Sequence, residues 1–392
     1  MHYDFQTVID RTNTGAIKHD IAPEAVKKAG SIPLTIADME YKVAPAIQAA
    51  VEKAAEHGIY GYTHVDDAYF AAVKLWMEKR FSYSPDRESM FNTAGVVTAL
   101  GMAVRAFTQV GDGVVIQPPV YPPFRFAVRD NFRTLLENPL LCKNGHYEMD
   151  FQGLEKLCKE KSPKLLILCS PHNPVGRVWT AEELTQLGEI CLKYGVFVVA
   201  DEIHADIVHH GKKHTVFATL PEMADNCMVC TAVSKTFNLA GLSCSNIFVA
   251  DKTHRDTFER VIRRESPNLI PYFARVATIA AYTECDAWLN ALLGNIEKNF
   301  NQLESFLQER LPMLKLTAAQ GTYLAWVDMR SLGLDDKELE QLMVNKAHLA
   351  LEIGQHFGTG GSGFERINLA LPKVALQDAL LRLEQAVKGT IR

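Results

Sequence analysis

Three side chains that could take part in chemistry follow apolar runs of the chain. Lys235 lies in "CTAVSKTFNLAGLSCSN", Asp201 follows "VFVVA", and Asn173 lies in "SPHNPVG". An amine is a useful nucleophile only when it is deprotonated, and burial or a cationic neighbour lowers its pKa. Because no acid adjoins Lys235 in the sequence, a lysine that bonds covalently to a ligand is one interpretation. A solvated lysine at a strand end is the other.

The elements that must position these residues alternate between about 46 and 280. Amphipathic spacing predicts helices in this region, and the helix expected at 180–193 begins with a capping box formed by Thr180 and Glu183. Continuous apolar runs separated by helices indicate a mostly parallel sheet flanked by helices, an α/β fold. Ligands bind at the carboxyl ends of such strands, so we expect the three side chains to converge. The expected helices span 46–58 and 180–193, and the expected strands span 113–117, 164–170, 196–201, 228–233 and 246–250.

The pattern changes from about residue 286. Amphipathic helices are expected at 288–310 and 336–347, and strands within 322–330 and 364–371. We therefore expect two domains. Residues 46–285 form a large ligand-binding domain, and residues 1–45 with 286–392 form a smaller α+β domain that completes the substrate site.

Composition excludes several classes of function. The chain has 392 residues, a net charge of −5 and no run of basic residues, which argues against nucleic acid or an anionic membrane as partner. The longest apolar runs are far shorter than the roughly 20 residues that span a bilayer. The N-terminus lacks the apolar core of a signal peptide, so we expect a cytoplasmic protein.

Cysteine and histidine clusters suggest metal or redox chemistry only weakly. The eight cysteines form no framework, and "CMVC" at 227–230 is a CxxC pair without a second pair for zinc. His204, His209, His210 and His214 lie close together in the sequence, but a solvated loop explains the last three more simply. We expect reduced thiols and no metal.

Seven phrases, in order along essentially the whole chain, resemble fold-type I pyridoxal-phosphate (PLP) enzymes of the class I/II aminotransferase superfamily. The resemblance is strongest to the cystathionine β-lyase (C–S lyase) branch of the MalY/PatB type. The phrases are "IADMEYKVAP", "GIYGYTHVDD", "SPHNPVGRVWT", "VVADEIHADIV", "SKTFNLAGL", "GTYLAWVDMR" and "GFERINLALP".

The resemblance implies a role for each residue around the cofactor ring. Lys235 is the Schiff-base lysine, and Asp201 faces the pyridine nitrogen, with a helix N-cap as its alternative role. Asn173 donates to the phenolic oxygen, which is compatible with its being a turn former. His204 contacts the same oxygen, where related aminotransferases often carry tyrosine. Tyr121 stacks on the ring, or is simply a core tyrosine.

The phosphate requires donors at a helix start. "TAGVVTALGMAV" supplies a glycine turn before a helical pattern, so the backbone N–H groups of Gly95, Val96 and Val97 are expected donors, with the Ser234 hydroxyl. Ser243 and Ala232 replace an arginine and a serine that many class I aminotransferases use here. The family's usual substitute is Tyr60 reaching in from a second subunit, which implies a homodimer; simple packing is the alternative.

Arg366 in "GFERINL" matches the arginine that binds the substrate carboxylate, for which a guanidinium fork is suited. A surface ion pair with Glu365 or another acid is the alternative. The preceding "FGTGGSG" lacks the strand and helix of a dinucleotide-binding loop and is interpreted as a loop that delivers Arg366.

The implied reaction begins when Lys235 removes the Cα proton of an amino acid as general base. Expulsion of a thiolate from Cβ gives β-elimination of L-cystathionine or a related cysteine S-conjugate to a thiol, pyruvate and ammonia. The same residues would serve an aminotransferase, so the preference for a C–S lyase rests on the resemblance. A regulatory binding protein that keeps the fold is a second alternative.

Overall fold

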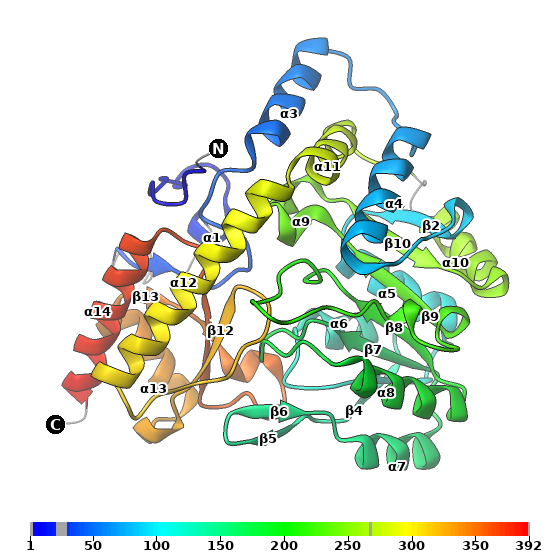
Figure 1. Ribbon diagram of the computed structural model, residues 1–392. Helices are drawn as coiled ribbons and strands as arrows, with labels where there is room; N and C mark the ends of the chain where they lie inside the picture. The colour runs from blue at the N-terminus through cyan, green and yellow to red at the C-terminus, as the bar shows by residue number, and fades with distance from the viewer. Residues whose placement is uncertain (1–2, 21–29, 266–268, 391–392) are drawn as a thin grey trace.

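A computed structural model describes residues 3–20, 30–265 and 269–390 (Figure 1). Its centre is a seven-stranded sheet in the order β2–β10–β9–β8–β7–β3–β4. Only β10 runs antiparallel to its neighbours, so the predicted mostly parallel sheet is confirmed. The strands are β2 (Met90–Thr93), β3 (Gly113–Ile116), β4 (Thr134–Glu137), β7 (Leu165–Cys169), β8 (Phe197–Asp201), β9 (Cys227–Thr231) and β10 (Ser245–Val249).

Both faces of this sheet are covered by helices. Two successive residues of β8 show this, because Val198 packs into one hydrophobic cluster and Val199 into the other. This double burial is why the strands read as continuous apolar runs. One cluster contains α4 (Asp67–Phe81), α7 (Phe151–Lys161) and α8 (Ala181–Tyr194), and the other contains α5 (Val96–Phe107), α6 (Pro123–Arg129) and α10 (Lys252–Glu265).

Two helix ends lie where the sequence predicts them: the start of α8 and the end of α3 (Pro45–His57). The Thr180 hydroxyl accepts a hydrogen bond from the Glu183 backbone N–H at 3.2 Å, and the Glu183 carboxylate accepts one from the Thr180 N–H at 2.8 Å, so the predicted capping box starts α8. Helix α3 ends at Gly58, whose φ of 71° is in the left-handed region.

A second, antiparallel sheet in the order β11–β12–β15–β14 belongs to the C-terminal part. The N-terminal segment joins this part, since β1 (Ile32–Pro33) pairs in parallel with β13 (Leu349–Ala350), and in Figure 1 the blue segment lies beside red α14. The division into domains 46–285 and 1–45 with 286–392 stays a prediction.

The remaining strands are β5 (Leu141–Lys143), β6 (His146–Glu148), β11 (Lys315–Leu316), β12 (Leu324–Asp328), β14 (Glu352–Ile353) and β15 (Phe364–Asn368). The remaining helices are α1 (Ile17–Asp20), α9 (Val233–Thr236), α11 (Tyr272–Glu284), α12 (Asp286–Arg310), α13 (Asp336–Gln341), a π-helical turn (Leu342–Ala347) and α14 (Lys373–Thr390). Short 3₁₀ turns lie at Arg87–Ser89, Phe217–Thr219, Ala224–Asn226, Ala240–Leu242, Arg330–Leu332 and Gly354–Phe357.

The interpretation of the histidine-rich stretch as a solvated loop is wrong for two of its residues. His214 is buried, and its Nε2 lies 2.9 Å from the Glu202 carboxylate. Both ring nitrogens of His209 lie within hydrogen-bond distance of backbone carbonyls, whereas His210 is exposed. In the ranges 3–20, 30–265 and 269–390, no group of His, Cys, Asp and Glu side chains is arranged to hold a metal ion.

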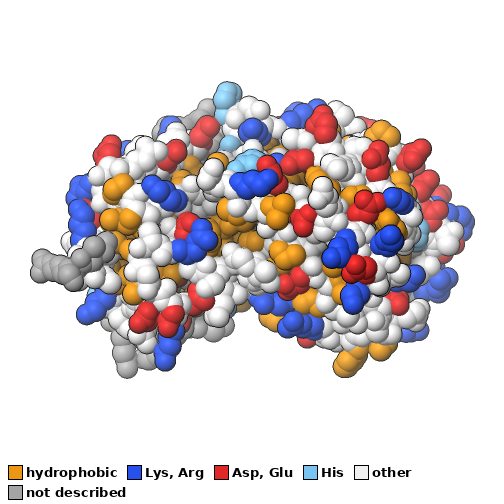
Figure 2. Space-filling model, turned by 90° about the horizontal axis from the view of Figure 1, so that it is seen from below, with side chains coloured by type: hydrophobic (Ala, Val, Ile, Leu, Met, Phe, Trp, Pro, Cys, Tyr) orange, Lys and Arg blue, Asp and Glu red, His pale blue; other side chains and the backbone are white. Residues whose placement is uncertain are grey.

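The surface carries charges of both signs. On the face shown in Figure 2, basic and acidic side chains are interspersed. Within the described parts of the chain, no helix is long and apolar enough to cross a membrane.

Candidate active site

A cavity of about 240 Å³ lies at the carboxyl ends of β7, β8 and β9 and at the start of α5. The topology explains the convergence, because neighbouring parallel strands end at one edge of the sheet. Nine of the predicted site residues line this cavity: Gly95, Val96, Val97, Tyr121, Asn173, Asp201, His204, Ser234 and Lys235.

Lys235 enters the cavity from the short helix α9, which follows β9. Its Nζ donates a hydrogen bond to the Ala37 carbonyl at 2.6 Å. Burial lowers the pKa of Lys235 to about 8, and the nearby Arg366 guanidinium adds to this, while Asp38 and Asp201 oppose it. The amine therefore loses its proton far more readily than that of a surface lysine, as a reacting amine requires.

Asp201 is the last residue of β8 and is 5% exposed. Burial raises its pKa to about 7, although a hydrogen bond from the Ile203 N–H at 3.1 Å and the charge of Lys235 oppose this. Because so few hydrogen bonds and charges offset the cost of burying this carboxylate, a cationic partner would stabilise it. A protonated ring nitrogen of a bound cofactor fits this requirement.

Arg366 approaches the cavity from β15 and is buried. Its Nη1 donates to the Asn173 Oδ1 at 3.1 Å, and its guanidinium lies over the Phe357 ring at 5.1 Å. The alternative of a surface ion pair is wrong, because Arg366 is buried and the Glu365 carboxylate has no hydrogen-bond partner within the described residues. Successive residues of a strand point to opposite faces, which separates the two side chains. The acid nearest to the Arg366 guanidinium is Glu352, 3.8 Å from Nη2.

His204 follows β8 and lies within the cavity wall. Burial lowers its pKa to about 3, and the charges of Lys235 and Arg366 lower it further, so the imidazole is neutral. Its buried Nδ1 has no hydrogen-bond partner among the described residues. A neutral imidazole with an unused nitrogen can contact a polar group of a ligand.

The start of α5 forms the end of the cavity suited to an anion. Gly95 has φ 94° and ψ 158°, a conformation that favours glycine, and no side chain in the described structure caps the helix. The N–H groups of Val96 and Val97 and the helix dipole favour a phosphate here. Ser234 and Ser243 line the same cavity, and Lys235 is the only cation among the described lining residues.

Tyr60 lies outside this cavity within a single chain. The residue is 56% exposed, its ring lies 5.1 Å from that of Phe273, and its hydroxyl donates to the Ala55 carbonyl at 2.8 Å. A contribution of Tyr60 to a second subunit's site stays a prediction.

Two features of the site were not predicted. The Ala37 carbonyl accepts hydrogen bonds from both Lys235 and the Tyr323 hydroxyl, the latter at 2.8 Å. Cys169 lines the cavity, and burial raises the pKa of its thiol. A backbone acceptor has no signature of residue type, whereas Cys169 could have been found because it is the last residue of its strand.

Comparison with known proteins shows which family this chain matches. The model of the family described as aminotransferase class I and II matches residues 30–383. Cystathionine beta-lyase PatB of Bacillus subtilis (strain 168) is 44% identical over 379 residues, which cover 96% of this chain and 98% of that protein.

Two solved structures extend this similarity to the fold. Cystalysin from Treponema denticola, which contains a pyridoxal 5'-phosphate cofactor, has a TM-score of 0.96 and 40% identity over 99% of this chain and 100% of that one. The PLP-bound C–S lyase from Staphylococcus hominis has a TM-score of 0.93 and 30% identity over 99% of this chain and 98% of that one. The chain therefore belongs to the aminotransferase class I and II family.

Proposed function

We propose that this protein is a PLP-dependent C–S β-lyase that cleaves L-cystathionine or related cysteine S-conjugates to a thiol, pyruvate and ammonia. The observation that carries this function is the amine of Lys235, with its lowered pKa, in one cavity with Asp201 and the uncapped start of α5. The similarity to proteins named cystathionine beta-lyase and C–S lyase supports the reaction type.

The cavity residues fit PLP. The N–H groups at Gly95–Val97 and the Ser234 hydroxyl would hold the phosphate, and Tyr121 would stack on the ring. Asn173 and His204 would contact the phenolic oxygen, and Asp201 would hold a proton on the ring nitrogen. When bound, PLP supplies an electron sink for negative charge at the substrate Cα.

The chain's own groups then perform the proton transfers. Arg366 binds the substrate carboxylate, for which its guanidinium offers several N–H donors. The Nζ of Lys235 takes the Cα proton as general base. The Ala37 carbonyl, which accepts from that Nζ at 2.6 Å, stabilises the resulting ammonium. Loss of the Cβ–S bond releases the thiolate, and hydrolysis of the remaining three-carbon unit yields pyruvate and ammonia.

Incubation with L-cystathionine in the absence of any keto acid tests this function. We expect pyruvate and thiol to accumulate in large molar excess over enzyme, because β-elimination regenerates the cofactor in each cycle. An aminotransferase converts its cofactor once and then stops until a keto acid is added. Pyruvate at or below the enzyme concentration would therefore contradict the lyase and favour the transaminase.

We further propose that the enzyme is a cytoplasmic homodimer in which Tyr60 completes the partner's phosphate site. Two observations support the dimer. Ile59, Tyr60 and Tyr62 form an exposed apolar segment, and the phosphate end of the cavity has no arginine among its described lining residues. Such a segment is typical of a protein interface.

Tyr60→Phe is expected to weaken PLP binding by about 10- to 100-fold, the effect of losing one hydrogen bond to a charged group. Titration of apoenzyme with PLP measures this affinity, and Tyr194→Phe, whose hydroxyl contacts Glu155 instead, is the control. Unchanged affinity in Tyr60→Phe, or a monomeric mass in sedimentation, would contradict the shared site.

A further inference from the structure

The segment 34–41, "LTIADMEY", contacts both Lys235 and Arg366. The Thr35 carbonyl accepts a hydrogen bond from Arg366 Nη2 at 2.7 Å, and the Ala37 carbonyl accepts one from Lys235 Nζ at 2.6 Å. One short piece of backbone therefore sets the surroundings of both the reacting amine and the guanidinium.

Polar side chains fix this segment on its inner side. Asn238, three residues beyond Lys235, accepts from the Met39 N–H at 2.9 Å and donates to the Met39 carbonyl at 3.1 Å. Asn368 donates to the Asp38 carbonyl at 2.7 Å. The segment is thus anchored directly to the turn that carries Lys235.

Two cations from the N-terminal part of the chain hold its outer side. Lys18 Nζ lies 2.7 Å from the Asp38 carboxylate and 2.8 Å from that of Glu40, and it donates to the Asp38 carbonyl at 2.9 Å. Arg11 pairs with the same two carboxylates at 2.7 and 2.9 Å. Lys18 is only 3% exposed, and a lysine this deeply buried must be paired.

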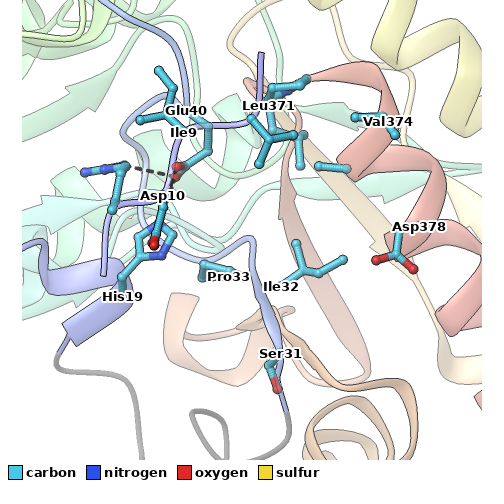
Figure 3. A pocket seen from close by; sticks show the side chains of 14 residues that line it. Ile9, Asp10, His19, Ser31, Ile32, Pro33, Glu40, Leu371, Val374 and Asp378 are labelled. Carbon is cyan, nitrogen blue, oxygen red and sulfur yellow. Dashed lines mark hydrogen bonds and ion pairs between the residues drawn. The ribbon is translucent and has the colours of Figure 1, made fainter. Parts of the chain in front are cut away.

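The outer face of this network borders a separate cavity of about 550 Å³ (Figure 3). Glu40 and His19 lie on its wall, and none of the residues that line it lines the cavity of Lys235. Glu40 and the half-buried Arg11 both line this outer cavity, so their charges are open to solvent screening. The pair of Lys18 and Asp38 is consequently the part of the network that acts most strongly on the reacting amine.

We propose that Lys18 is a positioning residue, which holds Asp38 and the Ala37 carbonyl against the amine of Lys235 and balances the charge of Asp38 there. The inference rests on the proposed role of Lys235 as the reacting amine. Removal of Lys18 leaves Asp38 paired only with the half-buried Arg11, and removal of Asp38 leaves Lys18 paired only with Glu40, so either change alters the charge balance near Lys235.

The direction of each effect follows from the groups that face Lys235. Arg366 and Lys18 lower its pKa, and Asp38 and Asp201 raise it. His204 is neutral, and the Tyr323 hydroxyl shares the Ala37 carbonyl with Lys235. Neutralising Lys18 must therefore raise the proton affinity of the Lys235 nitrogen, and neutralising Asp38 must lower it. A role in packing alone would not produce shifts of opposite sign.

Titration of the visible absorbance of bound PLP against pH tests this, because that band reports protonation at the Lys235 nitrogen. In the holoenzyme, Lys18→Met is expected to raise the midpoint and Asp38→Asn to lower it, each by about one pH unit. Lys18→Arg, which keeps the charge, should retain the wild-type midpoint. The matched control is Lys193→Met, which breaks a surface ion pair with Glu155 and should change nothing.

Midpoints that move in the same direction, or do not move, would overturn the inference. If Lys18→Met does not fold, Asp38→Asn and Lys18→Arg must still give a lowered and an unchanged midpoint. The readout needs no substrate. Normal titrations without pyruvate production would therefore overturn only the lyase proposal, whereas a wild-type holoenzyme without a titrating band would overturn the assignment of Lys235.

Discussion

Lys235→Ala is expected to lower kcat/KM for β-elimination of L-cystathionine by about 10⁴-fold, the upper range for loss of a positioned general base. The amine of Lys235 has a pKa of about 8, so it can take and return a proton near neutral pH, and it lies in one cavity with Asp201 and the start of α5. Initial rates of pyruvate formation measure the loss. The visible absorbance of bound PLP should change as well, since the covalent attachment is removed.

The control for this substitution is Lys193→Ala, which removes an exposed lysine of α8. It should leave both the rate and the absorbance unchanged. A Lys235→Ala enzyme that kept more than about a tenth of the wild-type kcat/KM would contradict the proposed general base.

The sheet could be predicted because its strands are buried on both faces. The strands β7, β8 and β10 lie within one residue of their predicted bounds and β9 within two, since double burial leaves an uninterrupted apolar run. Helix α4 was not predicted, although Tyr69, Val73 and Trp76 have helical spacing and Asp66 caps its start. The exposed hairpin of β5 and β6 offers no comparable apolar pattern.

The order of side chains along the sheet could be predicted for a similar reason. Asn173 follows β7, Asp201 ends β8 and Lys235 follows β9, so strand order alone brings them together. The carbonyls of Thr35 and Ala37 could not be found, because a backbone acceptor is independent of residue type.

The burial of His214 was missed for a different reason. The polar sequence "HHGKKH" around it is typical of a surface loop. Its partner Glu202 lies twelve residues earlier, and only the fold shows that the two side chains compensate each other's burial.

Asp201→Asn is expected to reduce kcat by about 10²- to 10³-fold, the effect of removing one preorganised electrostatic contact in a buried site. Asparagine preserves the shape but cannot stabilise a positive charge on the ring nitrogen, so negative charge at Cα loses its sink. Steady-state kinetics with L-cystathionine measure the change. Asp206→Asn is the matched control, because Asp206 is equally buried but faces Trp76 and Thr236. Equal losses of kcat in both variants would contradict a specific role.

The same substitution should have the opposite effect on the stability of the apoprotein. Burial raises the folded-state pKa of Asp201 from 3.8 to about 7, so the folded chain binds this proton more tightly than the unfolded chain. The resulting stabilisation is complete below pH 4 and is lost as pH rises through 7. Asparagine stays neutral, and apo Asp201→Asn should therefore gain stability relative to wild type between pH 4 and 8 in urea unfolding. Because bound PLP supplies the cation, saturation with PLP should abolish or reverse that gain, and an equal gain in both forms would contradict the placement of Asp201 opposite the ring nitrogen.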